Sequence, residues 1–286
     1  MTTLGWPLLC TLLLWWGSTA LLLFLATRSS LVARSMVLMS ALCVAAWAGL
    51  LAVAHTTTVA AAWCSFSCGL LIWGWIELSY LTGVLTGPAS AQMPCPPGLR
   101  GWRRFGAAIR TSLWHELAVL GTGVVLLWAT WGAPNRVGVD AYLVLWIMRW
   151  SAKLNLFLGV PNLNAEFFPK HLRFLETWIA RRPMNGLFPI SVTGATVVLA
   201  FVVQAALTAE TDFARVGEVC VATLLALAVL EHWFLVLPLN DAALWRWALP
   251  RDGGGVVDPL GAPTAASASG GPIASGAGLG PLRDPG

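Results

Sequence analysis

The segment VAAAWCSFSCGLLIWGWIELSYL, residues 59–81, carries one charged side chain, Glu77, in a long run of apolar and small residues. A helix rises about 1.5 Å per residue, so about 20 such residues cross a hydrocarbon core of about 30 Å. Similar runs recur along the 286-residue chain, which is 57% hydrophobic and only 10% charged, with a mean hydropathy of +0.73. Because so few charges cannot cover a soluble globule, the sequence predicts an integral membrane protein.

The repeated apolar runs predict an all-α fold, a polytopic membrane helix bundle with about seven transmembrane helices. The predicted spans are residues 5–26, 35–54, 59–81, 111–131, 137–160, 187–208 and 213–239. No Lys or Arg precedes the first run, which favours a retained helix over a signal peptide.

The positions of the basic residues predict the orientation of the bundle. Lys and Arg gather after the first, third, fifth and seventh spans, whereas Arg136 and Arg215 lie in the opposite connections. Cations in short loops stay on the cytoplasmic side, so we expect an N-terminus outside and a cytoplasmic C-terminus. The net charge of +4 is therefore mainly a topology signal, and we expect no nucleic-acid partner.

Two connecting segments have a character of their own. Residues 82–110 are rich in Pro and Gly, which favours a cytoplasmic connector, and their Arg-Gly-Trp-Arg-Arg end should lie against anionic headgroups. Residues 162–182 predict a short amphipathic helix with Leu172 and Leu175 on one face. This helix either lies in the membrane interface, with Trp178 at headgroup level, or docks a partner.

The end of the chain differs from the rest in composition. Residues 251–286 consist largely of Gly, Ala, Ser and Pro, which cannot recover the entropy cost of ordering. We therefore expect one membrane domain over residues 1–250, followed by a disordered tail.

Polar and ionisable residues within the spans share the predicted cytoplasmic half of the membrane. They are Glu77, His115, Glu116, Arg149, Lys153, Asn155, Glu231 and His232. Arg149 and Lys153 lie one turn apart on one helix face, and each costs about 2.5–3.5 kcal/mol at mid-membrane unless it is compensated. Pairing them with Glu77, Glu116 and Glu231 leaves one negative charge in excess. The cluster can tie helices together, form a ligand or cofactor pocket, or conduct protons or ions.

The same residues also suggest that a metal ion or a pigment could bind. Carboxylate and imidazole groups suit several transition metals, but the neighbours His115 and Glu116 diverge by about 100° on a helix, as do Glu231 and His232. We therefore leave the metal unknown and assign no catalytic residue. His115 or His232 could instead ligate the magnesium of a bacteriochlorophyll.

Two stretches resemble a known family. RWSAKLNLFLGVPNLNAEFFPKHLRFLETW, residues 149–178, is similar to the signature region of the PuhE-type photosynthetic complex assembly proteins of purple phototrophic bacteria. The likeness includes TGPASAQMPCPPGLRGWRRF and TSLWHEL, within residues 86–117, and it covers most of the chain except the tail. It implies a multi-pass protein of the bacterial inner membrane, cytoplasmic or intracytoplasmic, that assists assembly of the reaction centre and light-harvesting ring, with bacteriochlorophyll supply or insertion as one route. It implies no residue roles.

Two functional hypotheses follow. In the first, which we prefer, a non-enzymatic assembly factor contacts reaction-centre or light-harvesting subunits, or pigment-biosynthesis proteins, through the segment after residue 160. The partner-binding candidates are Asn162, Asn164, Glu166, His171 and Arg173. In the second, an integral-membrane metal-dependent enzyme acts on a lipid or pigment precursor, with Glu116 as base or ligand. A transporter is less favoured because no inverted repeat is evident.

Overall fold

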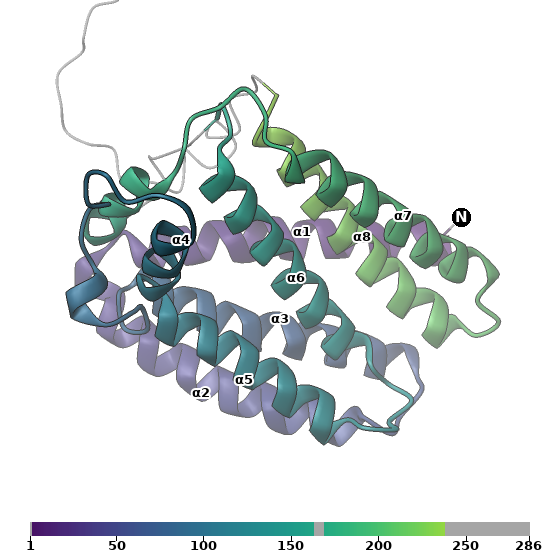
Figure 1. The fold of residues 1–286 in the computed structure, drawn as a ribbon. Helices are drawn as coiled ribbons and strands as arrows, with labels where there is room; N and C mark the ends of the chain where they lie inside the picture. The colour runs from purple at the N-terminus through teal and green to yellow at the C-terminus, as the bar shows by residue number, and fades with distance from the viewer. Residues whose placement is uncertain (1, 163–168, 238–286) are drawn as a thin grey trace, which may run out of the picture. The chain divides into compact units, whose positions relative to one another are not determined.

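The computed structural model describes residues 2–162 and 169–237, which form helices joined by loops (Figure 1). The predicted tail, residues 251–286, lies outside the described residues. The α-helices are α1 (Thr2–Ala26), α2 (Ser29–Val53), α3 (Val59–Leu81), α4 (Gly101–Arg110), α5 (Leu113–Ala129), α6 (Val137–Leu158), α7 (Leu187–Thr208) and α8 (Asp212–Phe234). Two short 3-10 helices are η1 (Ala89–Ala91) and η3 (Lys170–Trp178). The described part of the chain contains no β-strand.

Helix α6 is the shared element of the bundle's apolar core. One cluster joins α2, α3, α5 and α6 around Tyr142, which is fully buried. A second cluster joins α3, α6 and α8 around Phe66, and a third joins α6, α7 and α8 around Met148. Helix α1 packs against α3 and α8, and α2 packs mainly against α3. The position of α6 therefore fixes how the other helices meet.

The exterior of the bundle is apolar and its interior holds polar groups. Leu13, Val37 and Phe201 are 52%, 73% and 71% exposed, whereas His115 and Asn135 are completely buried. Water would penalise such a distribution, but a hydrocarbon solvent favours it. The predicted class, an all-α polytopic membrane bundle, is confirmed.

Five helices, α1, α2, α3, α7 and α8, are long and apolar enough to cross a membrane, and the bent pair α4 and α5 gives a sixth if it counts as one span. Helix α5 alone has 17 residues. Helix α6 has 22 residues, but Asp140, Arg149 and Lys153 lower its hydropathy. The count of seven spans and the orientation of the bundle stay predictions.

The predicted span over residues 111–131 begins differently in the structure. Helix α4 ends at Arg110, α5 begins at Leu113, and their axes meet at 74°. A contact with the preceding loop stabilises this break, because the His115 backbone N–H donates to the carbonyl of Thr86 at 3.0 Å. Gly87 also lies so close to the backbone of Arg110 that a Cβ there would overlap it. The basic end of the predicted connector is thus a helix.

Helices α3 and α6 approach closely at a pair of glycines. A Cβ on Gly69 would lie 2.9 Å from the Cα of Gly138, so neither position tolerates a side chain without movement. The Gly138 backbone N–H donates to Ser65 Oγ at 2.9 Å across the same contact. Small residues at such crossings let membrane helices pack closely without hydrophobic driving force. This crossing positions the polar residues further along both helices.

Candidate functional site

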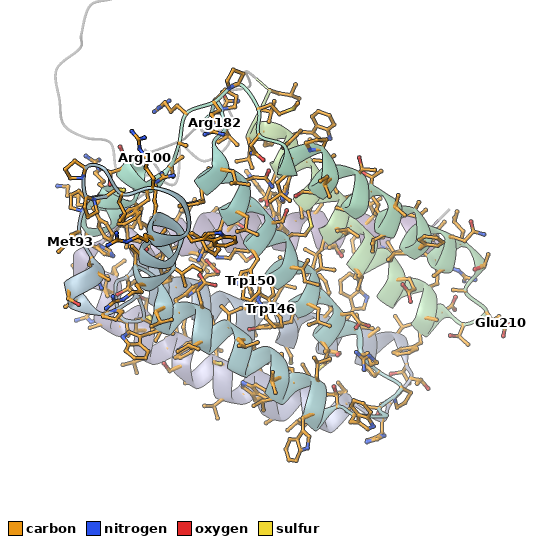
Figure 2. All side chains as sticks on the ribbon, in the orientation of Figure 1. Met93, Arg100, Trp146, Trp150, Arg182 and Glu210 are labelled. Atoms are coloured by element: carbon orange, nitrogen blue, oxygen red, sulfur yellow. The ribbon has the colours of Figure 1, made fainter. Side chains whose placement is uncertain are left out.

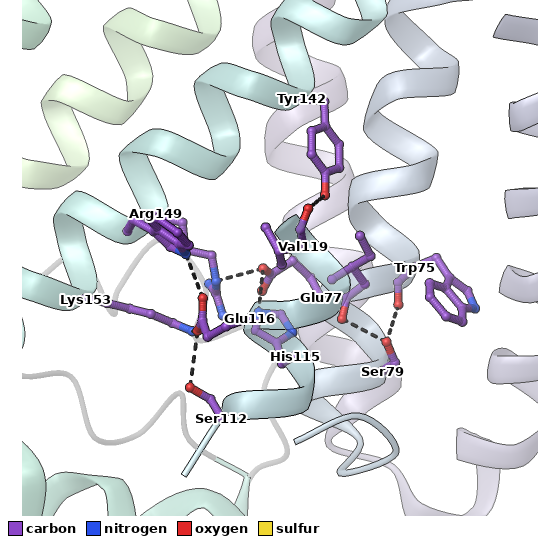
Figure 3. Close-up of polar contacts among 12 residues, drawn as sticks. Trp75, Glu77, Ser79, Ser112, His115, Glu116, Val119, Tyr142, Arg149 and Lys153 are labelled. Carbon is purple, nitrogen blue, oxygen red and sulfur yellow. Dashed lines mark hydrogen bonds and ion pairs between the residues drawn. The ribbon is translucent and has the colours of Figure 1, made fainter. Parts of the chain in front are cut away.

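Two ion pairs connect α3, α5 and α6 inside the bundle (Figure 3). Arg149 Nε lies 2.8 Å from Glu77 Oε1, and Lys153 Nζ bonds Glu116 Oε1. The Trp150 indole N–H donates to the second carboxylate oxygen of Glu116 at 2.6 Å. Four of the predicted cluster residues are therefore brought together, with both cations on α6 and one carboxylate on each neighbouring helix.

Helical spacing explains how these side chains meet. Arg149 and Lys153 are four residues apart, so both point from one face of α6 toward α3 and α5. His115 and Glu116 are adjacent on α5 and diverge, which directs His115 toward α3 and Glu116 toward α6. Because the two adjacent side chains diverge, they are poorly placed to share a metal ion, but they let α5 contact both α3 and α6.

An aromatic side chain, Tyr80, lies against this cluster. Its ring centroid is 4.5 Å from that of His115, and it lies 5.7 Å from the Arg149 guanidinium and 5.0 Å from Lys153 Nζ. His115 is fully buried, with Nε2 3.8 Å from Glu77 Oε1. Tyr80 was not among the predicted residues, although its position three residues after Glu77 places it on the same helix face.

The charges in the cluster balance without the third predicted glutamate. Two cations form ion pairs with two carboxylates, Glu77 and Glu116, while Glu231 is exposed on α8. Glu231 forms neither of the two ion pairs, so the excess negative charge expected from three glutamates stays a prediction. The packing of α8 on α7, α1 and α6 sets its rotation about its axis, which turns His232 inward and Glu231 outward.

A second polar network joins α6, α7 and α8 through the other predicted residues. His232 contacts Ser151 Oγ at 2.9 Å through Nε2 and the Ala228 carbonyl at 2.8 Å through Nδ1. Asn155 is fully buried and donates to Ser191 Oγ on α7 at 3.1 Å. These contacts join α6, α7 and α8, as is expected of polar residues in a membrane bundle.

An asparagine that the sequence reasoning missed organises the turn after α6. The Asn185 side-chain amide donates to the carbonyls of Asn155 and Gly159, at 3.1 and 2.9 Å. Its oxygen accepts the backbone N–H groups of Leu187 and Phe188, at 2.9 and 3.1 Å. One side chain thus caps the end of α6 and the start of α7. Its position just before an apolar run was the available signal.

The predicted partner-binding residues have different surroundings. Asn162 faces inward, where its side chain donates to the Phe234 carbonyl at the end of α8 at 3.0 Å. Asn164 and Glu166 lie outside the described residues. His171 and Arg173 are exposed on η3. Desolvation by its surroundings lowers the pKa of His171 below its ordinary value.

Residues 82–110 and 169–182 fold against each other at one end of the bundle, and we call them the cap. The Trp178 indole N–H donates to the Met93 carbonyl at 3.0 Å, and the Cys95 backbone N–H donates to Thr177 Oγ1 at 2.8 Å. Arg104 of α4 donates to the Trp178 carbonyl at 2.5 Å. Trp178 is buried in these contacts, so its ring is not free to contact headgroups, while the position of η3 in the membrane interface stays a prediction. The helix that carries it docks onto its own chain.

The donor groups of the cluster bear on the metal and pigment hypotheses. No group of three His, Cys, Asp or Glu side chains within residues 2–162 and 169–237 is arranged to hold a metal ion. His115 is enclosed between α3 and α5, and both ring nitrogens of His232 contact protein oxygens. Neither imidazole presents a nitrogen at the outer surface, where a macrocycle could reach it.

The fold and the buried ion pairs define a polytopic helical membrane protein whose charged groups join helices. The chain belongs to a family of proteins of unknown function, DUF3623, whose sequence model matches residues 1–254. It is also similar to a protein of Rhodobacter capsulatus described as an uncharacterized 30.4 kDa protein in the puhA 5′ region. The two are 37% identical over 247 residues, covering 85% of this chain and 89% of the relative. No solved structure matches the chain.

Proposed function

We propose that this protein is a non-enzymatic assembly factor for the photosynthetic reaction centre and light-harvesting complex. The relative from Rhodobacter capsulatus is described by its position in a puhA 5′ region, which supports a photosynthesis-related membrane protein. The PuhE-type resemblance points to the same class. The assembly role itself is the proposal.

The observation that carries the proposal is the packing of the two stretches that bear the resemblance. Residues 86–117 supply α4 and the start of α5, and residues 149–178 supply the end of α6 and η3. These stretches meet in the cap and in the ion pairs, through Arg104 with Trp178 and through Glu116 with Lys153. Because the two stretches that bear the resemblance contact each other although they are far apart in sequence, we infer that they act together.

The electrostatics of the cluster favour a scaffold over an enzyme. Both cations are neutralised by carboxylates of the same chain, and Glu116 also accepts bonds from Trp150 and Ser112. A carboxylate held in this way is poorly placed to act as a general base. The exposed part of η3, around Lys170 and Arg173, remains available for a partner subunit.

Affinity purification in mild detergent from phototrophically grown cells tests the proposal. The tagged full-length protein should retain reaction-centre or light-harvesting subunits at near-stoichiometric amounts. Arg173→Glu on the exposed face of η3 should reduce that retention at unchanged protein level, while Arg136→Glu at the other end of α6 should not. Retention of pigment-biosynthesis enzymes alone, or of no protein, would contradict the assembly role.

A further inference from the structure

Helix α4 has an inner face that belongs to the cap and an outer face that does not. On the inner face Arg104 bonds the Trp178 carbonyl, and the Phe105 ring lies 5.5 Å from that of Phe157 on α6. The outer face presents Trp102, Arg103, Gly106, Ile109 and Arg110, all exposed. Helix α4 has 10 residues, and its largest side chain, Trp102, is 85% exposed instead of packing against the bundle. Such a mixture of aromatic, aliphatic and basic residues is typical of a helix in the membrane interface.

The angle between α4 and α5 places this outer face. Only Thr111 and Ser112 separate the two helices, and their axes meet at 74°. If α5 runs across the bilayer, α4 lies near the membrane plane, at the depth where headgroups begin. An exposed Trp and flanking Arg side chains prefer that depth, because the ring is amphipathic and the cations reach phosphates.

Charge is distributed unequally between the two ends of the bundle. At the end opposite the cap, Arg136 lies 3.5 Å from Asp140, and Arg215 lies 2.9 Å from Asp212. The exposed cations of the cap form no ion pair with any described acidic side chain; they are Arg100, Arg103, Arg110, Lys170, Arg173, Arg181 and Arg182. Figure 2 shows Arg100 and Arg182 at this end and Glu210 at the other. The cap end is therefore rich in cations that the described acidic side chains do not neutralise.

We propose that the outer face of α4 binds the headgroups of anionic phospholipids, with Arg103 and Arg110 on the phosphates and Trp102 and Ile109 among the upper acyl chains. The bilayer is the occupant because α4 is tethered to a membrane helix within two residues. Each cation near an anionic surface strengthens binding by about fivefold. The contact is independent of the proposed assembly role, since it needs no partner protein.

Hydrogen exchange of the purified full-length protein in nanodiscs tests this surface. Amides of residues 101–110 should exchange more slowly as phosphatidylglycerol replaces phosphatidylcholine, and high salt should reduce the difference. The double variant Arg103→Gln/Arg110→Gln should weaken the phosphatidylglycerol dependence by about 25-fold, from about fivefold per cation. The matched double variant Arg136→Gln/Arg215→Gln removes the same charge and should leave the dependence unchanged.

A second pair of variants separates the aromatic contribution from charge. Trp102→Ala should speed exchange in α4, whereas Trp131→Ala, which removes an 84% exposed tryptophan beyond the far end of α5, should not. Unchanged hydrogen exchange in α3 establishes that a variant is folded. If the double variant fails this control, the single variant Arg103→Gln replaces it in the experiment. Equal exchange of α4 in both lipids, or slowing that needs an added acidic protein, would overturn the proposal.

Discussion

Replacing Arg149 by Leu should strongly destabilise the bundle, because it leaves the Glu77 carboxylate without its cation. The two side chains are 29% and 8% exposed, so the carboxylate is nearly inaccessible to solvent. Removing one partner of a buried ion pair typically costs about 3–5 kcal/mol. Since Arg149 itself is nearly one-third exposed, solvent screening reduces the interaction, and we expect about 3 kcal/mol.

The reasoning also predicts which second change restores stability. Arg149→Leu combined with Glu77→Gln buries a neutral amide in place of an unpaired charge. We expect the double variant to lie within about 1 kcal/mol of the wild type, since replacing both partners of a buried pair is often nearly neutral. Lys153→Leu is the matched comparison, because its partner Glu116 keeps the bonds from Trp150 and Ser112. Its expected cost is about 1–2 kcal/mol.

The assay is the free energy of unfolding of the purified full-length protein in one defined lipid–detergent mixture, measured for the wild type, both single variants and the double variant. A thermodynamic cycle then isolates the coupling between Arg149 and Glu77. The explanation is refuted if Arg149→Leu costs no more than Lys153→Leu, or if Glu77→Gln fails to restore stability. Either result would mean that the carboxylate is compensated by something other than the guanidinium.

Three other contacts predict stability changes that the same unfolding assay can measure. Gly138→Ala should cost about 1–3 kcal/mol, since the new Cβ would overlap the α3 backbone, whereas Gly121→Ala, with open space around it, should be neutral or stabilising by up to about 1 kcal/mol. Asn185→Ala should cost about 1–2 kcal/mol, because backbone groups of two helices lose their cap. Tyr142→Phe should cost about 1 kcal/mol, since its buried hydroxyl donates to an α5 carbonyl at 2.8 Å. A neutral result at any of the three would show that the contact contributes nothing net.

The sequence identified candidate members of the polar cluster, but it could not show which of them meet. In a hydrocarbon solvent a cation inside a span must face a compensating group, so Arg149 and Lys153 required carboxylates at a similar depth. Glu77 and Glu116 satisfy that requirement, and apolar periodicity located the helices that carry them. Depth alone could not exclude Glu231, because the rotation of α8 depends on contacts with neighbouring helices.

The residues that sequence reasoning missed act through tertiary contacts. Gly69 and Gly138 resemble other span glycines until α3 and α6 are brought together. Asn135 reads as a loop residue, yet it is completely buried and its side-chain amide donates to the carbonyls of Val53 and Ala61, at 3.1 and 3.0 Å. Such roles depend on which backbone groups a fold leaves unsatisfied, and that is known only from the assembled bundle.

The ion pairs and the cap are connected through α6, which suggests why the cluster is charged. Apolar side chains could hold α3, α5 and α6 together equally well, but they would allow the helices to slide or rotate, whereas two ion pairs define one register. Helix α6 carries both cations, and its last turn places Phe157 against α4 of the cap. We therefore expect that even the stable double variant Arg149→Leu/Glu77→Gln exchanges its cap amides faster than the wild type. Equal exchange would mean that the cap is positioned by its own contacts and that the charges serve stability alone.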